Sequence, residues 1–301
     1  MVLRRICNAL MAVRFRHEAP DNREGREFNS SRGHQFITSQ HGERMNQIVN
    51  LNGKIGLITG IANDKSIAYG VAKACRSAGA ELAITYQTEK TSKYTKPLAD
   101  DLESKVFTLC DVTVPGSLEA VFEQIEKEYG KLDFVLHSMA FAPMEDLHGN
   151  LIDCSADGFA KSMDISVHSL IRVAKLAEPL MKDGGAIVTM TYLGADRVVE
   201  NYGIMGLCKA ALESATRYLA HELGPKNIRV YAVSPGPMFT RAASGINHFD
   251  ELMDKAVNRS PLHRLATIDQ VGNLTAFLVS DAASGMTGDI IYVDAGYHIE
   301  A

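Results

Sequence analysis

Tyr202 and Lys209 are the side chains in this sequence whose types and spacing point most directly to chemistry. They bound the stretch YGIMGLCK, which has a helical pattern, and seven residues is close to two turns of an α-helix. Both side chains would leave the same face, about 10 Å apart along the axis. A phenol and an ammonium placed together could stabilise negative charge that develops on an oxygen atom. The alternative is a surface helix with an amphipathic tyrosine and a solvated lysine.

The elements that would position this pair alternate along the chain from Leu51 onward. Short apolar runs rich in β-branched residues predict strands at 54–60, 81–87, 105–112, 133–141, 185–192, 228–236 and 289–296. Amphipathic stretches predict helices at 66–79, about 91–102, 116–129, 156–182, 202–223 and 269–280. Nearly uninterrupted apolar strands separated by helices are typical of a parallel sheet covered on both faces. The expected fold is a single α/β domain of the Rossmann type, doubly wound around seven parallel strands, with ligands at the strands' carboxyl ends.

One connection, about 237–262, is longer than an ordinary link between a strand and a helix. Small residues there precede a short helical pattern at 248–258, and long ordered insertions at a ligand-bearing edge are often lids. We expect a substrate-binding lid with an apolar wall formed by Ile246, Phe249, Leu252 and Met253. Ordinary packing of an amphipathic helix, or a surface excursion, is the alternative.

Composition and charge favour a soluble enzyme-sized domain without nucleic acid or membrane partners. The chain has 301 residues, 46% of them hydrophobic and 22% charged, with a net charge of -5 and no basic cluster in its main body. No apolar run is long enough to span a bilayer. The five cysteines are widely spread, without a CxxC pair or a histidine spacing that suggests zinc, so we expect reduced thiols, no metal site and a cytoplasmic location.

Residues 1–46 differ from the rest and are expected to lie outside the fold, with the domain over 47–301. Residues 1–44 hold eight arginines, no lysine and five acidic residues, with little apolar periodicity after Phe15. The first 17 residues are rich in arginine and free of acids, as in an organelle transit peptide. An upstream start that adds a disordered tail, with Met45 as the functional beginning, is at least as good an interpretation.

The first two predicted strands end in residues suited to a dinucleotide. The first ends in TGIANDKSIAYG, where Gly60 and Gly70 bracket a turn and Ser66 could cap the helix or bond a phosphate oxygen. The second ends in TYQTEK, which offers Gln87 where NAD-binding folds often carry an acid and NADP-binding folds favour an arginine. A neutral amide suits an unphosphorylated ribose, so NADH is expected, although Lys90 and Lys93 keep NADPH as the alternative.

The next four strand ends add further groups at the same edge. Asp111 and Val112 follow the third strand and could bond and pack an adenine, although an aspartate in this position is also a common turn residue. The fourth runs into HSMAFAP, whose small residues would let a ribose approach the backbone, and the fifth is followed by Tyr192. The sixth ends in SPGPMFT, a turn whose amides could hold a carboxamide. Six consecutive strand ends that suit one ligand are hard to attribute to chance.

From about residue 49 the chain resembles the bacterial enoyl-[acyl-carrier-protein] reductases (NADH), a divergent family of the short-chain dehydrogenase/reductase superfamily. The matching stretches are GIANDKSIAYG, AITYQ, CDV, HSMAFAP, TYLGADR, NYGIMGLCKAALE, SPGP, TRAASGI and YVDAGY. The most specific feature is Tyr-x6-Lys with a second tyrosine ten residues earlier, because most of the superfamily uses Tyr-x3-Lys and Met205 occupies that position here. The chain departs from the family at Met139-Ala140, where Ile-Gly is more familiar, and at Phe239, where some relatives carry arginine.

This resemblance implies a set of site residues. Three are implied to be catalytic: Tyr202, Lys209 and Tyr192. The implied cofactor-binding residues are Gly60, Ser66, Ile67, Gln87, Asp111, Val112, Met139, Lys209, Met238, Phe239, Thr240, Arg241 and Ala242. Ala142, Tyr192 and Tyr202 are implied to contact substrate. The resemblance also implies an acyl carrier protein as partner, a homotetramer, and a role in type II fatty acid synthesis.

The wide spacing suggests how the pair would work in such an enzyme. Hydride addition to the β carbon of a trans-2-enoyl thioester leaves an enolate oxygen, which Tyr202 would stabilise while Lys209 binds the nicotinamide ribose. Tyr192 could orient the thioester carbonyl or only line the pocket. The alternatives are another short-chain dehydrogenase/reductase with a different carbonyl or enoyl substrate, and a dinucleotide-sensing protein without catalysis. Chain-length preference and inhibitor sensitivity do not follow from the sequence.

Overall fold

The computed structural model describes residues 48–240 and 249–300. The chain divides into two units, and these residues belong to the second, Asn46–Ala301. The first unit, Met1–Met45, lies outside the described residues, as does the whole of the predicted extension over 1–46.

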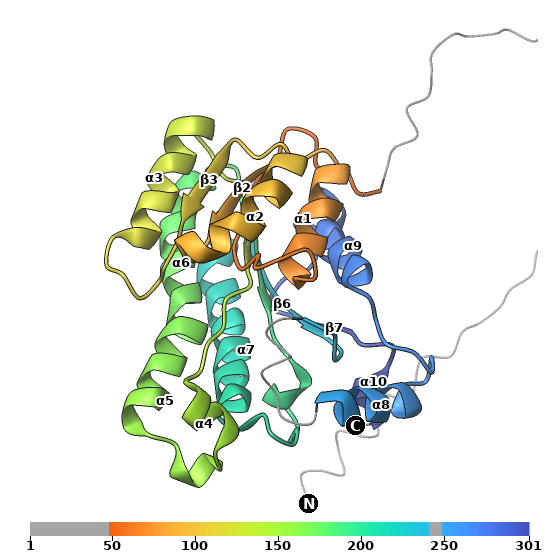
Figure 1. The fold of residues 1–301 in the computed structure, drawn as a ribbon. Helices are drawn as coiled ribbons and strands as arrows, with labels where there is room; N and C mark the ends of the chain where they lie inside the picture. The colour runs from red at the N-terminus through yellow and green to blue at the C-terminus, as the bar shows by residue number, and fades with distance from the viewer. Residues whose placement is uncertain (1–47, 241–248, 301) are drawn as a thin grey trace, which may run out of the picture. The chain divides into compact units, whose positions relative to one another are not determined.

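Seven parallel strands form one sheet in the order β3-β2-β1-β4-β5-β6-β7 (Figure 1). The strands are β1 (Ile55–Ile58), β2 (Glu81–Tyr86), β3 (Val106–Leu109), β4 (Phe134–His137), β5 (Gly185–Met190), β6 (Ile228–Pro235) and β7 (Ile290–Val293). The order reverses between β1 and β4, and such a switch point opens a crevice at the carboxyl ends of the strands. The doubly wound α/β prediction is confirmed, and each strand falls within its predicted range.

Helices cover both faces of this sheet (Figure 1). The side chains buried between helices and sheet form two hydrophobic cores. One core lies under α1 (Ile67–Ser77), α2 (Glu89–Asp101) and α9 (Ile268–Val279). The other lies under α3 (Ser117–Tyr129), α6 (Ser169–Ala177) and α7 (Gly203–Leu223). Because both faces are covered, inner strands such as β1 and β4 are buried at every residue, which explains their nearly uninterrupted apolar sequences.

The stretch 156–182, predicted as one helix, is interrupted, and that prediction is wrong in detail. The structure has α5 (Ala156–Met163), a π turn η2 (Asp164–His168), α6, and a 3-10 turn η3 (Glu178–Leu180). A proline at residue 179 explains the final tightening, since proline cannot donate a helical backbone hydrogen bond. The π turn adds one residue to a helical turn, and apolar periodicity carries no sign of it.

Beyond β6, the predicted helical pattern at 248–258 corresponds to α8 (Phe249–Arg259). Met253 and Ala256 of α8 are buried, and Ala256 packs in a small cluster with Leu193 and Tyr297 of the terminal helix α10 (Tyr297–Glu300). Residues 241–248 of the predicted lid, Ile246 among them, lie outside the described residues.

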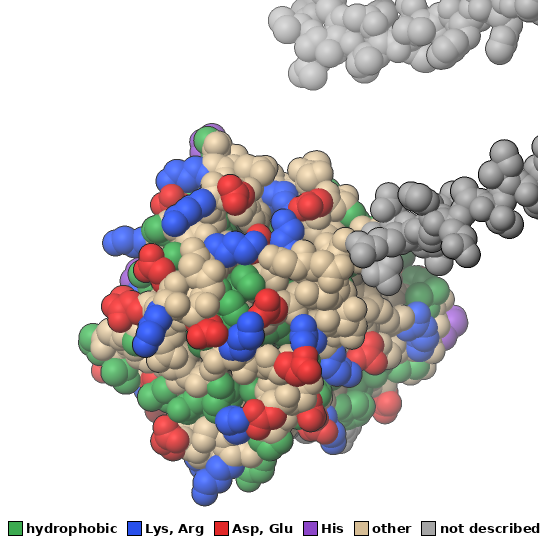
Figure 2. Space-filling model, turned by 90° about the horizontal axis from the view of Figure 1, so that it is seen from above, with side chains coloured by type: hydrophobic (Ala, Val, Ile, Leu, Met, Phe, Trp, Pro, Cys, Tyr) green, Lys and Arg blue, Asp and Glu red, His purple; other side chains and the backbone are tan. Residues whose placement is uncertain are grey.

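The surface seen in Figure 2 carries lysine and arginine side chains interspersed with aspartate and glutamate. Such a mixture does not form the single-sign field that attracts a phosphate backbone. Within 48–240 and 249–300, no helix combines the length and the apolar character needed to cross a membrane.

Candidate active site

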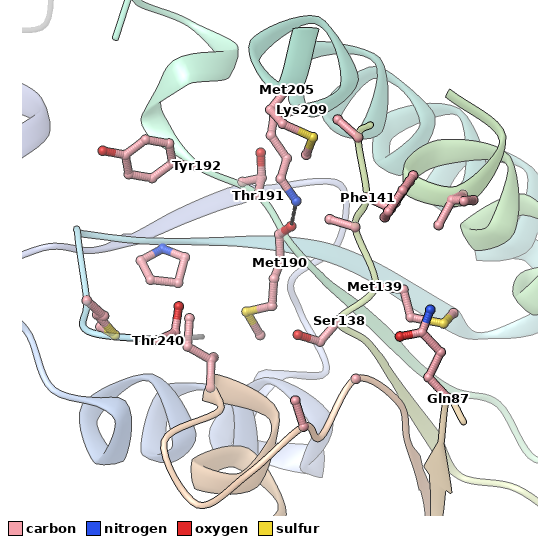
Figure 3. Close-up of a pocket in the computed structure, with 18 of the residues that line it drawn as sticks. Gln87, Ser138, Met139, Phe141, Met190, Thr191, Tyr192, Met205, Lys209 and Thr240 are labelled. Carbon is pink, nitrogen blue, oxygen red and sulfur yellow. Dashed lines mark hydrogen bonds between the residues drawn. The ribbon is translucent and has the colours of Figure 1, made fainter. Parts of the chain in front are cut away.

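A cavity of about 730 Å³ lies along the carboxyl ends of the strands. Its size is in the range of small-molecule and cofactor sites. Gln87 lies at one end and Tyr192 at the other, with the residues that follow β4 and β5 between them (Figure 3). The cavity wall contains these predicted site residues: Gly60, Ile67, Gln87, Val112, Met139, Ala142, Tyr192, Tyr202, Lys209, Met238 and Thr240.

Gly60 lets the turn after β1 lie close to the chain that leaves β4. Its φ is +90°, a conformation that favours glycine, and an added Cβ would stand 2.0 Å from the Ser138 carbonyl oxygen. The turn leads into α1, whose first residue, Ile67, also lines the cavity. A backbone cradle that a side chain would fill, at a helix N-terminus, is suited to a pyrophosphate.

Ser66 bonds its own turn, and of the two roles predicted for its hydroxyl the helix cap is wrong, whereas the phosphate contact stays a prediction. Its Oγ accepts hydrogen bonds from the backbone N–H groups of Ala62 and Asn63, at 3.0 and 3.1 Å. It makes no side-chain cap for α1 and does not line the cavity. The hydroxyl therefore shapes the glycine turn from within, because the turn has backbone donors that no strand partner satisfies.

The ends of β2 and β3 form the far part of the cavity. Gln87 and Val112 line it, together with Cys110. Asp111 does not: its Oδ1 accepts the N–H and the hydroxyl of Thr113, at 2.9 and 2.7 Å, in a local turn. The simpler interpretation of an aspartate after a strand, a turn residue, describes this contact.

Tyr202 and Lys209 both face this cavity from α7. Tyr202 directly precedes the first residue of α7, and Lys209 follows two turns later. Their exposed fractions are 8% and 6%, so the alternative of a solvated surface pair is excluded. Burial holds the pKa of the Tyr202 phenol well above its ordinary value of 10, so the hydroxyl keeps its proton and can donate a hydrogen bond.

Lys209 points from α7 toward the end of β5 (Figure 3). Its Nζ donates to the Met190 carbonyl oxygen at 2.7 Å. Desolvation lowers the pKa of the ammonium from 10.5 to about 8, so the group is still charged at neutral pH. A buried cation with one carbonyl partner among the described residues has donors left for a ligand.

Tyr192 completes the aromatic end of the cavity. Its ring meets the Tyr202 ring edge to face, with centroids 4.9 Å apart at 66°. Among the described residues its buried hydroxyl has no hydrogen-bond partner, and burial raises its pKa well above 10. A buried, unpaired phenol costs stability, which marks it as a group that a ligand could satisfy.

The segment after β6 closes the remaining side. Met238 is buried and lines the cavity with Thr240, whereas Phe239 is 63% exposed and does not line it. Arg241 and Ala242, the last two predicted cofactor residues, lie outside the described residues.

Two glycines that the sequence reasoning did not single out shape the space around Tyr202. A Cβ at Gly194 would meet Tyr202 Cδ1 at 2.5 Å, and a Cβ at Gly206 would meet the Gly194 carbonyl at 2.9 Å. The turn η4 (Leu193–Ala195) and α7 therefore touch through glycine, with the phenol packed across the contact. The glycine in TYLGADR is the signal that could have indicated this close approach.

The chain has close relatives among known proteins. Residues 60–298 match the family model described as Enoyl-(Acyl carrier protein) reductase. The Rhizobium meliloti protein "Enoyl-[acyl-carrier-protein] reductase [NADH] 1" is 47% identical over 248 residues, which cover 82% of this chain and 91% of that protein. The crystal structure of the Anaplasma phagocytophilum reductase in complex with NAD has a TM-score of 0.80 at 45% identity, covering 83% of this chain and 95% of that one. The Bacillus cereus Enoyl-Acyl Carrier Protein Reductase with NADP+ and indole naphthyridinone has a TM-score of 0.81 at 44% identity, covering 83% and 98%.

Proposed function

The chain belongs to the enoyl-[acyl-carrier-protein] reductase family of the short-chain dehydrogenase/reductase superfamily, and from that premise we propose how its residues perform the reaction. It is an NADH-dependent oxidoreductase of fatty acid synthesis, which reduces a trans-2-enoyl thioester to the saturated acyl thioester. The observation that carries the residue assignments is that Tyr202 and Lys209 are both buried and line the same cavity.

Tyr202 stabilises the oxygen of the substrate thioester in this proposal. Reduction of a double bond conjugated to a thioester places negative charge on the carbonyl oxygen, one atom removed from the carbons of that bond. A neutral phenol fixed by packing against Gly194 can donate to this oxygen without reorganising. Because Tyr202 is seven residues from Lys209 instead of four, it lies farther from the lysine along α7 and closer to an oxygen remote from the reacting carbon.

Lys209 holds the nicotinamide end of the cofactor in this proposal. The cavity fits a dinucleotide: a glycine cradle lies beside an open helix N-terminus, a neutral Gln87 lies at one end, and a cation lies near the other. Bound NADH supplies the hydride. The Lys209 ammonium, oriented by the Met190 carbonyl, has donors for ribose hydroxyls and provides a positive field near the substrate oxygen.

Tyr192 lines the substrate end and supports Tyr202 by edge-to-face contact. Its unpaired hydroxyl lies in the same aromatic end of the cavity, where Ala142 also contributes to the wall. We assign Tyr192 the role of lining the pocket. The alternative is that its hydroxyl orients the thioester carbonyl, and the substitution Tyr192→Phe distinguishes the two roles.

We propose that the natural substrate is carried by an acyl carrier protein. We also propose that the domain over 47–301 has a lid at about 237–262 and works as a homotetramer in the cytoplasm. Light scattering during size-exclusion chromatography measures the assembly directly. A fully active monomer would contradict the proposed tetramer and would leave the roles proposed for the catalytic residues unchanged.

The function is tested by following NADH oxidation with a crotonyl thioester, a longer 2-enoyl thioester and a 3-oxoacyl thioester. We expect turnover with both enoyl substrates, none with the 3-oxoacyl thioester, and slower reaction when NADPH replaces NADH. Turnover only with the 3-oxoacyl substrate would assign the chain to another branch of the superfamily. NADH binding without turnover of any substrate would favour a dinucleotide sensor.

A further inference from the structure

The chain that leaves β4 crosses the cavity without a strand partner, and buried hydroxyls hold its backbone instead. At its start, the Ser138 N–H donates to the Thr59 hydroxyl at 3.3 Å, and that hydroxyl donates to the Leu136 carbonyl at 2.9 Å. Three residues later, the Phe141 N–H donates to the Ser166 hydroxyl at 3.0 Å. Backbone groups near a cavity need such partners, because water is excluded when a ligand binds.

Ser166 satisfies both backbone groups of one residue. Its hydroxyl accepts from the Phe141 N–H and donates to the Phe141 carbonyl, at 3.0 and 3.1 Å, and its side chain is completely buried. Phe141 and Ala142 both line the cavity. One hydroxyl therefore holds the backbone of the cavity wall at Phe141, next to Ala142, which is predicted to contact substrate.

The position of Ser166 depends on the π turn η2. In a regular helix the Ser169 N–H would bond the Ile165 carbonyl four residues back, but here it bonds the Asp164 carbonyl, five residues back. The Ser169 hydroxyl donates to the Ile165 carbonyl at 2.6 Å. The turn packs against α7, the helix that carries Lys209, and Ile165 lines the cavity. Ser166 lies within this turn, and its side chain reaches the Phe141 backbone from there.

His137, the last residue of β4, holds this arrangement from the other side. The Ser169 hydroxyl donates its one proton to the Ile165 carbonyl oxygen. It therefore acts as the acceptor for His137 Nε2–H, at 2.8 Å. Nδ1 then accepts from the Thr189 hydroxyl at 2.9 Å. The imidazole is fully buried and stays neutral, because burial and the nearby Lys209 charge lower its pKa to about 3.

We propose that Ser166 is a positioning residue for the reduction: held by the π turn, it fixes the Phe141–Ala142 backbone against α7 so that the substrate oxygen meets the Tyr202 hydroxyl. This inference rests on the proposed function for its catalytic readout. Ser166 touches neither substrate nor cofactor in this assignment, and it acts through the cavity wall. The hydrogen bonds of Ser166 go to the Phe141 backbone and not to the glycine turn or Gln87.

The test compares Ser166→Ala with Ser162→Ala in the full chain. Ser162 is a matched control: it is equally buried, lies one helical turn earlier, and its hydroxyl has no hydrogen-bond partner among the described residues. Ser166→Ala should lower kcat with a 2-enoyl thioester roughly 10- to 100-fold, the effect of small misplacement at a reacting centre. The Kd for NADH should stay within about twofold in both variants, and kcat of Ser162→Ala within about twofold of the parent.

Hydrogen exchange at Phe141 provides a readout that needs no activity. The Phe141 amide should exchange faster in Ser166→Ala, because this variant loses the hydroxyl that accepts its hydrogen bond. In Ser162→Ala its exchange rate should be the same as in the parent. Unchanged exchange, unchanged kcat, an equal loss in both variants, or a parallel loss of NADH affinity would each overturn the proposal. The parent rate with enoyl thioesters tests the function itself, whereas exchange at Phe141 and the ratio between variants test Ser166.

Discussion

Replacing Lys209 with methionine should change how the stability of the cofactor-free protein depends on pH. Lys209 is buried, and desolvation lowers its pKa from 10.5 to about 8. Each unit of pKa is worth about 1.4 kcal/mol, so holding the charged ammonium costs the folded protein about 3 kcal/mol. The cost applies in full below a pH of about 8, where the amine is charged in both the folded and the unfolded chain.

Between pH about 8 and 10.5 the unfolded chain binds more protons at this lysine than the folded one. The lysine therefore makes the free energy of unfolding rise with pH across that window, and Lys209→Met removes this rise. Below it the variant should be more stable than the parent by up to about 3 kcal/mol, reduced by about 1 kcal/mol for the lost hydrogen bond to Met190.

Thermal unfolding of both proteins at one fixed concentration, from neutral pH to about 10.5, measures the two curves. Lys175→Met, at an exposed position on α6, is the matched control and should keep the parent's pH profile. Binding of NADH at neutral pH should weaken by about tenfold or more in Lys209→Met and stay unchanged in the control. Parallel unfolding curves together with unchanged NADH affinity would refute both the burial cost and the ribose assignment.

Three further substitutions probe the packing around the site. Gly194→Ala should lower kcat roughly 10- to 100-fold in NADH oxidation assays, since the new Cβ would stand 2.5 Å from the Tyr202 ring; full activity would show that the ring can move freely. Tyr192→Phe should keep kcat within about fivefold and leave the melting temperature equal or higher, because no hydrogen bond among the described residues is lost; a larger fall in kcat would assign its hydroxyl to the substrate. His137→Gln should reduce the loss of stability as pH falls from 6.5 toward 3, because the unfolded chain protonates His137 in this range and the folded chain does not. A dependence of melting temperature on pH identical to the parent's would contradict a neutral His137 imidazole in the folded protein.

The architecture could be predicted from the sequence because strands that are buried on both faces are apolar at nearly every position. Runs such as IGLI and FVLH have no polar alternation, and six strand ends gave ligand-suited residues in order. The cavity gathers most of those residues, from Gly60 to Thr240, because the carboxyl ends of parallel strands share one edge.

The contacts of short polar side chains could not be predicted in the same way. Ser66 and Asp111 are predicted to contact a ligand from their type and position, and in the structure both make local hydrogen bonds to their own turns. Whether a short polar side chain serves its turn or a ligand depends on a rotation that periodicity does not record. The π turn that contains Ser166 is hidden for a similar reason, since part of its support comes from His137, which bonds Ser169 from 32 residues earlier in the sequence.

Hydride transfer in a single turnover tests the role of the Tyr202 hydroxyl most directly. Stopped-flow decay of NADH fluorescence, with saturating 2-enoyl thioester, compares the parent with Tyr202→Phe. The account predicts that the rate falls about 100-fold, the loss expected for one preorganised donor to a developing oxyanion, while the Kd for NADH changes less than about twofold. A rate within about threefold of the parent, or an equal loss of NADH affinity, would contradict it.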